Sequence, residues 1–155
     1  MITPREWSMG DYTVSSDATR LQLGVIHQFL AGSYWAGGIS LETVERSVAG
    51  SVAFGVYQGQ EQVGFARVIT DLATFAYLAD VFVLEQHRGR GIARWLVRCI
   101  QETPELQSLR RWLLVTRDAH AIYRSVGFLP VANPENLMEI VRKDAYLEPT
   151  QPSVP

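Results

Sequence analysis

The chain has 155 residues, of which 47% are apolar and 19% charged, and its net charge is −2. A domain of this length buries enough surface to fold without disulfides or metals, and an acidic balance disfavours a dedicated nucleic-acid-binding domain. No apolar run reaches the roughly 20 residues of a membrane span, the first residues lack the apolar core of a signal peptide, and the single cysteine, Cys99, fits a reducing compartment, so we expect a soluble cytoplasmic protein with neither nucleic acid nor membrane as a partner.

The first third of the chain predicts one strand and two helices. Residues 11–15 are typical of a short strand, and Asp17 offers an N-cap for a helix whose apolar residues recur at helical spacing until Gly32. A loop rich in aromatic residues and glycine, residues 33–38, leads to a second helix over residues 40–48. Two helices thus follow the first strand.

The middle of the chain changes to strand patterns. Residues 53–57 and 61–70 are rich in β-branched and aromatic residues and flank the turn residues 59–60, which predicts a hairpin. Residues 74–84 form a long apolar run, which is typical of a strand covered on both faces. These three strands are expected to form the centre of a sheet.

Helices and strands alternate after that run. A third helix begins at Ile92, with its apolar residues on one face. Residues 111–116 predict a strand, and Asp118 is placed to cap a short helix over residues 119–126 that ends at Gly127.

The last part of the chain predicts two short strands, residues 128–131 and 137–141, followed by a proline-rich and disordered tail, residues 148–155. The element order is then β-α-α-β-β-β-α-β-α-β. This order indicates a mixed α/β fold in a single domain, residues 1–147, with helices on the faces of the sheet.

The stretch LEQHRGRGIARWL, residues 84–96, places two glycines and two arginines between a strand and a helix. The first N–H groups of a helix have no intrahelical acceptor and lie at its positive end, so they favour anions. Glycine lets the backbone approach a phosphate closely. The stretch therefore predicts a phosphate or pyrophosphate site, and the alternative is a glycine turn with solvated arginines. It is no Walker loop, and Arg94 stands where a dinucleotide fingerprint has its third glycine.

Two segments carry a resemblance to a family. Residues 81–93, with the spacing Gln86-x-x-Gly89-x-Gly91, resemble the acetyl-CoA-binding segment of the GNAT superfamily of N-acetyltransferases. Residues 118–128 resemble the family's next motif, a short helix carrying tyrosine before Gly-Phe, although Ala121 stands where glycine is common. The resemblance extends over about residues 11–141 and implies the family's mostly antiparallel sheet.

The resemblance also implies acetyl-CoA as co-substrate and a possible homodimer, and the residues themselves lead us to expect no metal. Backbone N–H groups of residues 87–91 would hold the pyrophosphate at the start of the third helix, the pantetheine arm would pair with Val81 and Val83, and Arg88, Arg90 or Arg94 could meet the phosphates. The cofactor-binding residues expected on this basis are Val81, Phe82, Val83, Gln86, His87, Arg88, Gly89, Arg90, Gly91, Ile92 and Ala93.

Amine acetylation needs a proton donor for the leaving thiolate, and Tyr123 is the candidate acid. A phenol with an ordinary pKa of about 10 stays protonated at neutral pH, and the matching tyrosine of the family has this role. The alternative is a tyrosine that only packs on its helix.

The reaction also needs a base, and Asp80 is the candidate. Strand alternation places it on one face with Leu78 and Phe82, where a carboxylate among apolar side chains is unfavourable unless it is paired. The alternative is a structural partner of Arg67. Tyr34 and Trp35, in the loop between the first two helices, either line the acceptor pocket or anchor the core.

We therefore expect an enzyme that acetylates the primary amine of a small molecule or peptide. A second hypothesis is a non-catalytic acyl-CoA sensor of the same fold, but the presence of Tyr123 disfavours it. The three histidines show no metal-ligand spacing, and Cys99 lies on the core face of its helix as a packed thiol.

Overall fold

The computed structural model describes residues 2–147, and the predicted tail, residues 148–155, lies outside this part of the chain. The strands are β1 (Glu6–Met9), β2 (Tyr12–Ser15), β3 (Val52–Gln58), β4 (Glu61–Thr70), β5 (Phe75–Val83) and β6 (Arg111–Leu113). The α-helices are α1 (Leu23–Ala31), α2 (Leu41–Ala49), α3 (Ile92–Gln101) and α4 (His120–Arg124). Four short 3-10 turns are η1 (Ala18–Arg20), η2 (Glu85–His87), η3 (Pro104–Leu106) and η4 (Pro134–Asn136).

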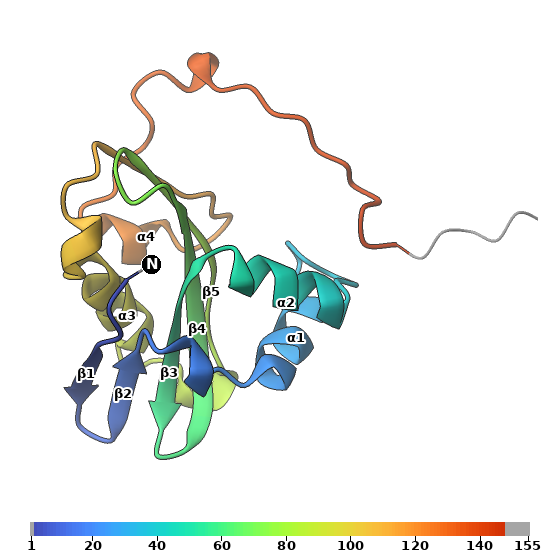
Figure 1. Ribbon diagram of the computed structural model, residues 1–155. Coiled ribbons are helices and arrows are strands. Elements are labelled where there is room, and N and C mark those ends of the chain that lie inside the picture. The colour runs from blue at the N-terminus through green and yellow to red at the C-terminus, as the bar shows by residue number, and fades with distance from the viewer. Residues whose placement is uncertain (1, 148–155) are drawn as a thin grey trace, which may run out of the picture.

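The strands form one six-stranded sheet in the order β1-β2-β3-β4-β5-β6. Neighbouring strands are antiparallel up to β5, and β6 runs parallel to β5. Helices α1 and α2 cover one face of the sheet, and α3 and α4 cover the other (Figure 1). The predicted fold class, a mixed and mostly antiparallel sheet flanked by helices, is therefore confirmed.

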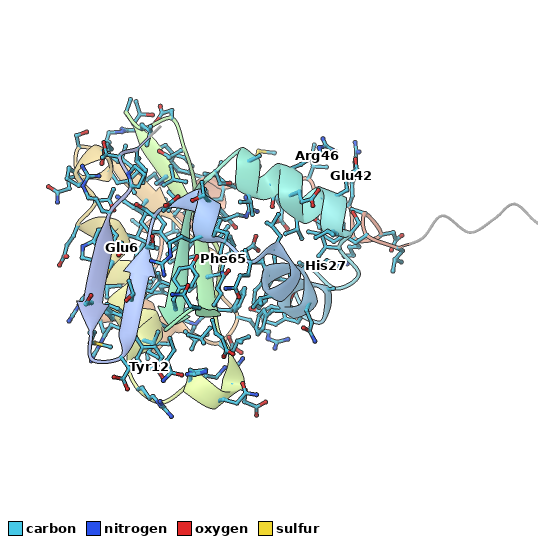
Figure 2. The ribbon with its side chains drawn as sticks, turned by 60° about the horizontal axis from the view of Figure 1, so that its bottom comes forward. Glu6, Tyr12, His27, Glu42, Arg46 and Phe65 are labelled. Carbon is cyan, nitrogen blue, oxygen red and sulfur yellow. The ribbon has the colours of Figure 1, made fainter. Side chains whose placement is uncertain are left out.

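Each face of the sheet has its own apolar core. On one face, Ile26 and Val44 of the two helices pack with Phe65 of the sheet, and Figure 2 shows Phe65 between the sheet and α1. On the other face, Leu96 and Ile100 of α3 are fully buried. Burying one such side chain contributes about 1.5–3 kcal/mol, so these two cores hold the helices to the sheet. Within residues 2–147, no helix is long and apolar enough to cross a membrane.

The first helix begins later than the N-cap at Asp17 predicts. Asp17 caps only the turn η1, and extended backbone at Leu21, with ψ 134°, ends that turn. The Gln22 N–H then donates to the Gln62 side chain at 2.7 Å, which ties the chain to β4 before α1 starts. The end of α1 at Gly32 agrees with the prediction.

The ends of the sheet differ from the predicted strands. Strand β1 was not predicted; it is short, mostly exposed and paired with β2 across a turn at Gly10, where φ is 56°. Residues 111–116 form a strand only as far as Leu113. Residues 128–131 and 137–141 form no strand in the described part of the chain, because their apolar pattern meets no neighbouring strand there.

The helix cap predicted at Asp118 is also wrong. The N-cap of α4 is Ala119, which has no side-chain hydrogen bond to the helix. Asp118 is mostly exposed, 3.9 Å from the Arg117 guanidinium. The short helix α4 is therefore positioned by its packing and by the hydrogen bond from the Phe128 N–H to the Tyr123 carbonyl oxygen, rather than by a side-chain cap.

Strands β5 and β6 separate after a short paired stretch. Their last paired residues are Tyr77 and Leu113. On its other side β5 stays paired with β4, with a register shift between Phe65 and Arg67 that marks a β-bulge. Beyond Tyr77, residues 78–83 have no strand partner on the β6 side in the described part of the chain.

Candidate active site

A cavity of about 1250 Å³ opens where β5 and β6 separate. Its walls come from the loop between α1 and α2, from β5, from the start of α3 with the loop before it, and from residues 115–125. Tyr146, close to the end of the described chain, also lines it. Small-molecule pockets usually have about 300–1,000 Å³, so this cavity has room for a large ligand and a second, smaller one.

All of the predicted site residues line this cavity except Gln86 and Arg90. Those that line it are Tyr34, Trp35, Asp80, Val81, Phe82, Val83, His87, Arg88, Gly89, Gly91, Ile92, Ala93 and Tyr123. Gln86 is exposed on the turn η2. The structure thus brings both predicted motifs and both predicted catalytic side chains to one place, and their roles stay predictions.

The loop before α3 ends in backbone donors without acceptors. Gly89 and Gly91 have φ values of 76° and 75°, a region that glycine adopts without steric cost. Among residues 2–147 no side chain caps α3, and the N–H groups of its first turn have no partner inside the helix. The N–H groups of His87 and Arg88 already donate within η2, so the free donors begin at Gly89 rather than at residue 87.

Tyr12 of β2 anchors this loop. The Tyr12 hydroxyl accepts from Arg90 Nη1 at 2.7 Å and lies 2.8 Å from His87 Nδ1. Its ring also meets the His87 ring edge-on, with 5.7 Å between centroids. Figure 2 shows Tyr12 at the end of the sheet beside this loop. The free N–H groups are therefore held in place before any ligand arrives.

The unpaired edge of β5 is partly covered by a side chain. Arg88 Nε donates to the carbonyl oxygen of Val83 at 3.0 Å. The backbone groups of Val81 keep no partner on the β6 side among the described residues. A ligand that pairs with this edge as an extra strand as far as Val83 competes with Arg88 for the Val83 carbonyl oxygen.

Asp80 lies at the bulge with both carboxylate oxygens engaged. Arg67 Nε donates to Oδ2 at 2.5 Å, and Trp35 Nε1 donates to Oδ1 at 2.9 Å. The Arg67 and Asp80 side chains are 17% and 10% exposed. Asp80 has a φ of 55°, which is uncommon for a residue with a side chain. The structural partnership with Arg67 is therefore present, and the carboxylate also lines the cavity.

A row of aromatic rings crosses the cavity wall from the sheet to the surface. Phe29 stacks on Phe82 with 4.0 Å between centroids, Trp35 lies 6.0 Å from Phe29, and Tyr34 lies 5.1 Å from Trp35. The Arg117 guanidinium sits 3.7 Å above the Tyr34 ring, a cation–π contact. Tyr34 and Arg117 thus link the loop between α1 and α2 to the segment after β6.

Tyr123 extends from α4 into the same cavity. Its ring packs edge-on against Phe128, with 5.9 Å between centroids. Among residues 2–147, no protein group forms a hydrogen bond with its hydroxyl, and burial raises the pKa of Tyr123 to about 12. The phenol is therefore protonated at neutral pH, and its proton is free to be donated to a ligand.

Sequence reasoning missed several residues of this cavity. Phe29, Tyr77, Arg117 and Tyr146 line it without having been predicted as site residues. Phe29 follows the apolar spacing of α1, which is also the pattern of a core residue, and Tyr146 belongs to no motif. Cys99 is buried, and burial raises the pKa of its thiol to about 12, which agrees with a packed thiol.

Comparison with known proteins gives consistent matches. A family model described as an acetyltransferase (GNAT) domain matches residues 49–130. A protein of Gibberella zeae named as a candidate acetyltransferase is 33% identical over 146 residues, which cover 80% of this chain and 82% of that protein. A GNAT-family crystal structure from Xanthomonas campestris pv. campestris has 44% identity and a TM-score of 0.86, and the match covers 91% of this chain and 100% of that chain.

A more distant structure shares the fold alone. It is a protein of Clostridium acetobutylicum, described as a predicted acetyltransferase and solved with acetyl-CoA, with 14% identity and a TM-score of 0.59. The match covers 91% of this chain and 96% of that chain. The family model spans β3 to α4, and with it the unpaired β5 edge and the glycine loop. The chain belongs to the GNAT family of acetyltransferases.

Proposed function

We propose that this protein transfers the acetyl group of acetyl-CoA to a primary amine by direct attack of the amine on the thioester. The proposal rests on one observation: three features lie next to one another in the same cavity. In the described part of the chain, an unpaired strand edge, residues 78–83, leads to free N–H groups at Gly89 and beyond, and the hydroxyl of Tyr123 has no protein partner there. The family uses acetyl-CoA, and each of these three features offers a contact to a different part of that molecule.

The donor side of the cavity consists of residues 78–94. Its backbone groups pair with the pantetheine arm as an added strand would, and the N–H groups from Gly89 into α3 receive the pyrophosphate. Arg88 leaves the Val83 carbonyl when the arm binds, and its charge then becomes free for a phosphate. Gln86 and Arg90 act through the loop, since neither lines the cavity.

Acetyl-CoA supplies a thioester, whose carbon–sulfur bond breaks as the bond to the amine nitrogen forms. A backbone N–H of β5 beyond Tyr77 is the donor for the thioester carbonyl oxygen. Tyr123 donates to the sulfur, on which negative charge develops. With a pKa of about 12 against about 8.5 for an ordinary thiol, Tyr123 acts mainly as a strong hydrogen-bond donor while the thiolate leaves.

Asp80 is the carboxylate placed to receive the amine. Each of its oxygens accepts one hydrogen bond from the protein, and each retains a lone pair for an ammonium or a water. The amine must lose a proton before it attacks, and Asp80 accepts that proton directly or through a water. Its partner Arg67 fixes its position at the bulge.

The acceptor side of the cavity is formed by the side chains of Phe29, Tyr34, Trp35, Tyr77, Asp80, Tyr123 and Tyr146. The acidic residues that line the cavity are Asp80, which is paired, and Asp118, which is mostly exposed. A polycation would therefore find little uncompensated negative charge here. The aromatic surface suits an amine carried on an aromatic or other apolar body.

The test is release of free thiol from acetyl-CoA in the presence of a panel of amines, with calorimetry of CoA binding alongside. We expect thiol release that requires an amine, and faster release with phenylalkylamines than with diamines and polyamines. If CoA binds and no amine accelerates thiol release, the protein is an acyl-CoA-binding protein rather than an enzyme. If polyamines are preferred, the assignment of the acceptor is wrong while the transferase activity stands.

A further inference from the structure

A cluster of three hydrogen-bonded side chains joins β2 to the loop before α3. Tyr12 of β2 is 7% exposed, and Figure 2 shows it at the end of the sheet. Its hydroxyl lies 2.7 Å from Arg90 Nη1 and 2.8 Å from His87 Nδ1. His87 lines the cavity and Arg90 does not. The cluster thus connects a charge outside the cavity with a ring on the cavity wall.

The donors and acceptors of this cluster can be counted. A guanidinium only donates, so the Tyr12 oxygen accepts the bond from Arg90. The hydroxyl has one hydrogen, and within residues 2–147 the His87 ring is its remaining partner. That hydrogen therefore points to His87 Nδ1, which accepts it. If Nδ1 donated instead, the hydroxyl hydrogen would have no acceptor inside the protein, which is unfavourable for a nearly buried group.

The bond from Tyr12 fixes the tautomer of His87. In a neutral imidazole one nitrogen carries the hydrogen and the other accepts, and the hydrogen bond at one nitrogen decides the role of the other. With Nδ1 as the acceptor, the hydrogen of the ring lies on Nε2. No group among residues 2–147 accepts a hydrogen bond from Nε2 of this ring. His87 therefore brings a free side-chain N–H to the cavity wall, two positions before the free backbone donors that begin at Gly89.

The hydrogen bonds of the cluster all run in one direction, from Arg90 to Tyr12 and from Tyr12 to His87. Successive hydrogen bonds polarise one another, so the charge of Arg90 makes the Tyr12 hydroxyl a stronger donor and, through Nδ1, strengthens the Nε2–H group. In the described part of the chain Arg90 forms no ion pair with a carboxylate. A chain of bonds that starts at a cation and ends in an N–H group favours an anionic oxygen at its end.

This cluster is not part of the glycine pattern of the loop. Tyr12 lies 75 positions before His87 and outside residues 49–130, which the family model matches. The two rings also meet edge-on, with 5.7 Å between centroids. Phenylalanine at position 12 would keep this ring contact and lose only the hydroxyl. The role of the hydroxyl can therefore be separated from the packing of the ring.

We propose that Tyr12 is a positioning residue that holds His87 as an Nε2–H donor for a phosphate of acetyl-CoA. Tyr12 sets the tautomer of the His87 ring, and Arg90 polarises the hydroxyl that does so. His87 contacts the phosphate, and Tyr12 and Arg90 act through His87. The identity of the ligand rests on the proposed function, whereas the tautomer is a property of the protein alone.

The first test is nitrogen NMR of the histidine rings in protein without ligand, at about pH 8, where an ordinary histidine is neutral. The chain has three histidines, and the signals lost in His87→Gln identify the ring of interest. We expect its hydrogen on Nε2, with Nδ1 bare. Tyr12→Phe should give a mixture of both tautomers, and Tyr57→Phe, which removes a buried hydroxyl away from the cavity, should change nothing. A hydrogen on Nδ1 as the main form of the unaltered protein overturns the proposal.

The second test is calorimetry of CoA binding. Tyr12→Phe should lower the affinity roughly threefold to tenfold, the effect of one hydrogen bond, and Tyr57→Phe is again the control. His87→Asn retains a polar group near the position of Nδ1 but has no donor at that of Nε2, so it should also weaken binding. His87→Gln places its amide nitrogen near the position of Nε2 and should retain more of the affinity than His87→Asn does.

The double variant separates the proposed role from simple anchoring of the loop. If Tyr12 acts through His87, Tyr12→Phe should have no further effect on CoA affinity in the His87→Asn background. A loss of the same size in both backgrounds would show that Tyr12 only anchors the loop, and it would overturn the proposal. The same titrations with dephospho-CoA locate the phosphate. An effect of Tyr12→Phe that persists places His87 at the pyrophosphate, and one that disappears places it at the phosphate on the ribose.

These measurements also distinguish a failure of this role from a failure of the proposed function. If the unaltered protein binds no CoA, the proposed function is wrong and His87 has no phosphate to bind, while the NMR of the protein without ligand still decides whether Tyr12 sets the tautomer. If CoA binds and Tyr12→Phe leaves its affinity unchanged, the role of Tyr12 is overturned and the proposed function stands.

Discussion

The proposed donor side of the cavity uses mainly backbone groups of one continuous stretch, residues 78–94. The proposed acceptor side is instead lined by side chains from segments far apart in the sequence. Trp35 and Asp80, for example, are 45 positions apart and meet at 2.9 Å. A backbone-built site tolerates many sequences as long as strand, turn and helix follow one another. A side-chain-built site changes with each substitution, so the proposed function predicts that recognition of acetyl-CoA and choice of acceptor are separable.

Tyr123 stands where the two sides meet, and its loss should have the largest effect. Tyr123→Phe removes the hydroxyl and keeps the ring that packs against Phe128. Turnover should fall by roughly 10²–10⁴, while CoA binding changes little. Tyr57→Phe is the control, because the buried Tyr57 hydroxyl has no hydrogen-bond partner within residues 2–147 and lies outside the cavity. If the two variants are equally active, Tyr123 only packs.

The pH dependence of turnover sharpens the role of Tyr123. Because burial raises the pKa of Tyr123 to about 12, the phenol keeps its proton throughout an ordinary assay range. Turnover should rise with pH as the acceptor amine, with an ordinary pKa of about 10.4 for a lysine-like amine, loses its proton, and it should show no descending limb below about pH 10. A descending limb near pH 8–9 that Tyr123→Phe abolishes would show a far more acidic phenol than this burial produces.

Asp80→Asn tests the acceptor side alone. It leaves the largely buried Arg67 without its carboxylate, which should lower the free energy of unfolding by about 3 kcal/mol, and it should slow turnover with an acceptor. Thermal melts and pH–rate profiles measure the two effects. In the double variant Arg67→Gln with Asp80→Asn, neither charge remains, so stability should recover. Activity that recovers together with stability would give Asp80 a structural role only.

The donor side could be predicted from the sequence because its elements are consecutive. A run of apolar residues, two glycines at the turn and an amphipathic helix define a strand, a loop and a free helix N-terminus without any knowledge of distant contacts. What the pattern did not show is the turn η2, which uses the N–H groups of His87 and Arg88. Nor did it show that Arg88 folds back onto Val83.

The acceptor side and the chain end could be predicted only in part. The helix pattern of Phe29 is the same for a core residue and for a residue that lines a cavity, and nothing local places Tyr146 beside Gly38. The ion pair of Arg67 and Asp80 was foreseen as one of two alternatives, because a carboxylate on an apolar strand needs a partner. Residues 137–141 have the pattern of a strand but no neighbour within one chain, so periodicity alone gave the wrong element.

Gly89→Asp should weaken CoA binding on the donor side of the cavity and leave the acceptor side unchanged. The substitution adds negative charge beside the free N–H groups that are proposed to bind the pyrophosphate. Calorimetry should therefore show that the CoA affinity falls at least tenfold, about 1.4 kcal/mol. Gly59→Asp is the matched control. Both glycines have positive φ, 76° and 60°, with nothing within 4 Å of an added Cβ, so both variants carry the same backbone strain. Equal CoA affinity in the two variants would remove the loop from the donor site.

Trp35→Phe should have the smallest effect. It should raise the acceptor KM, whereas Gly89→Asp should lower the affinity for CoA. The substitution removes the N–H that donates to Asp80 at 2.9 Å, and it retains a ring next to Tyr34 and Phe29. Losing one hydrogen bond at a partly exposed site costs about 0.5–1.5 kcal/mol. The acceptor KM should therefore rise roughly threefold to tenfold, with the affinity for CoA unchanged.

The control for this variant is Trp7→Phe, since Trp7 packs on Phe54 at the far edge of the sheet. This substitution should change neither the acceptor KM nor the CoA affinity.

The comparison of the two sides of the cavity depends on whether Trp35→Phe changes only the acceptor KM or the CoA affinity as well. If Trp35→Phe weakens CoA binding as much as it raises the acceptor KM, the indole supports the whole cavity and the two sides are coupled. If it raises only the acceptor KM, a change in the loop between α1 and α2 can alter the choice of amine while the acetyl-CoA site stays intact. Such a separation is what a backbone-built donor side permits, because none of its ligand-facing groups depends on the identity of residue 35.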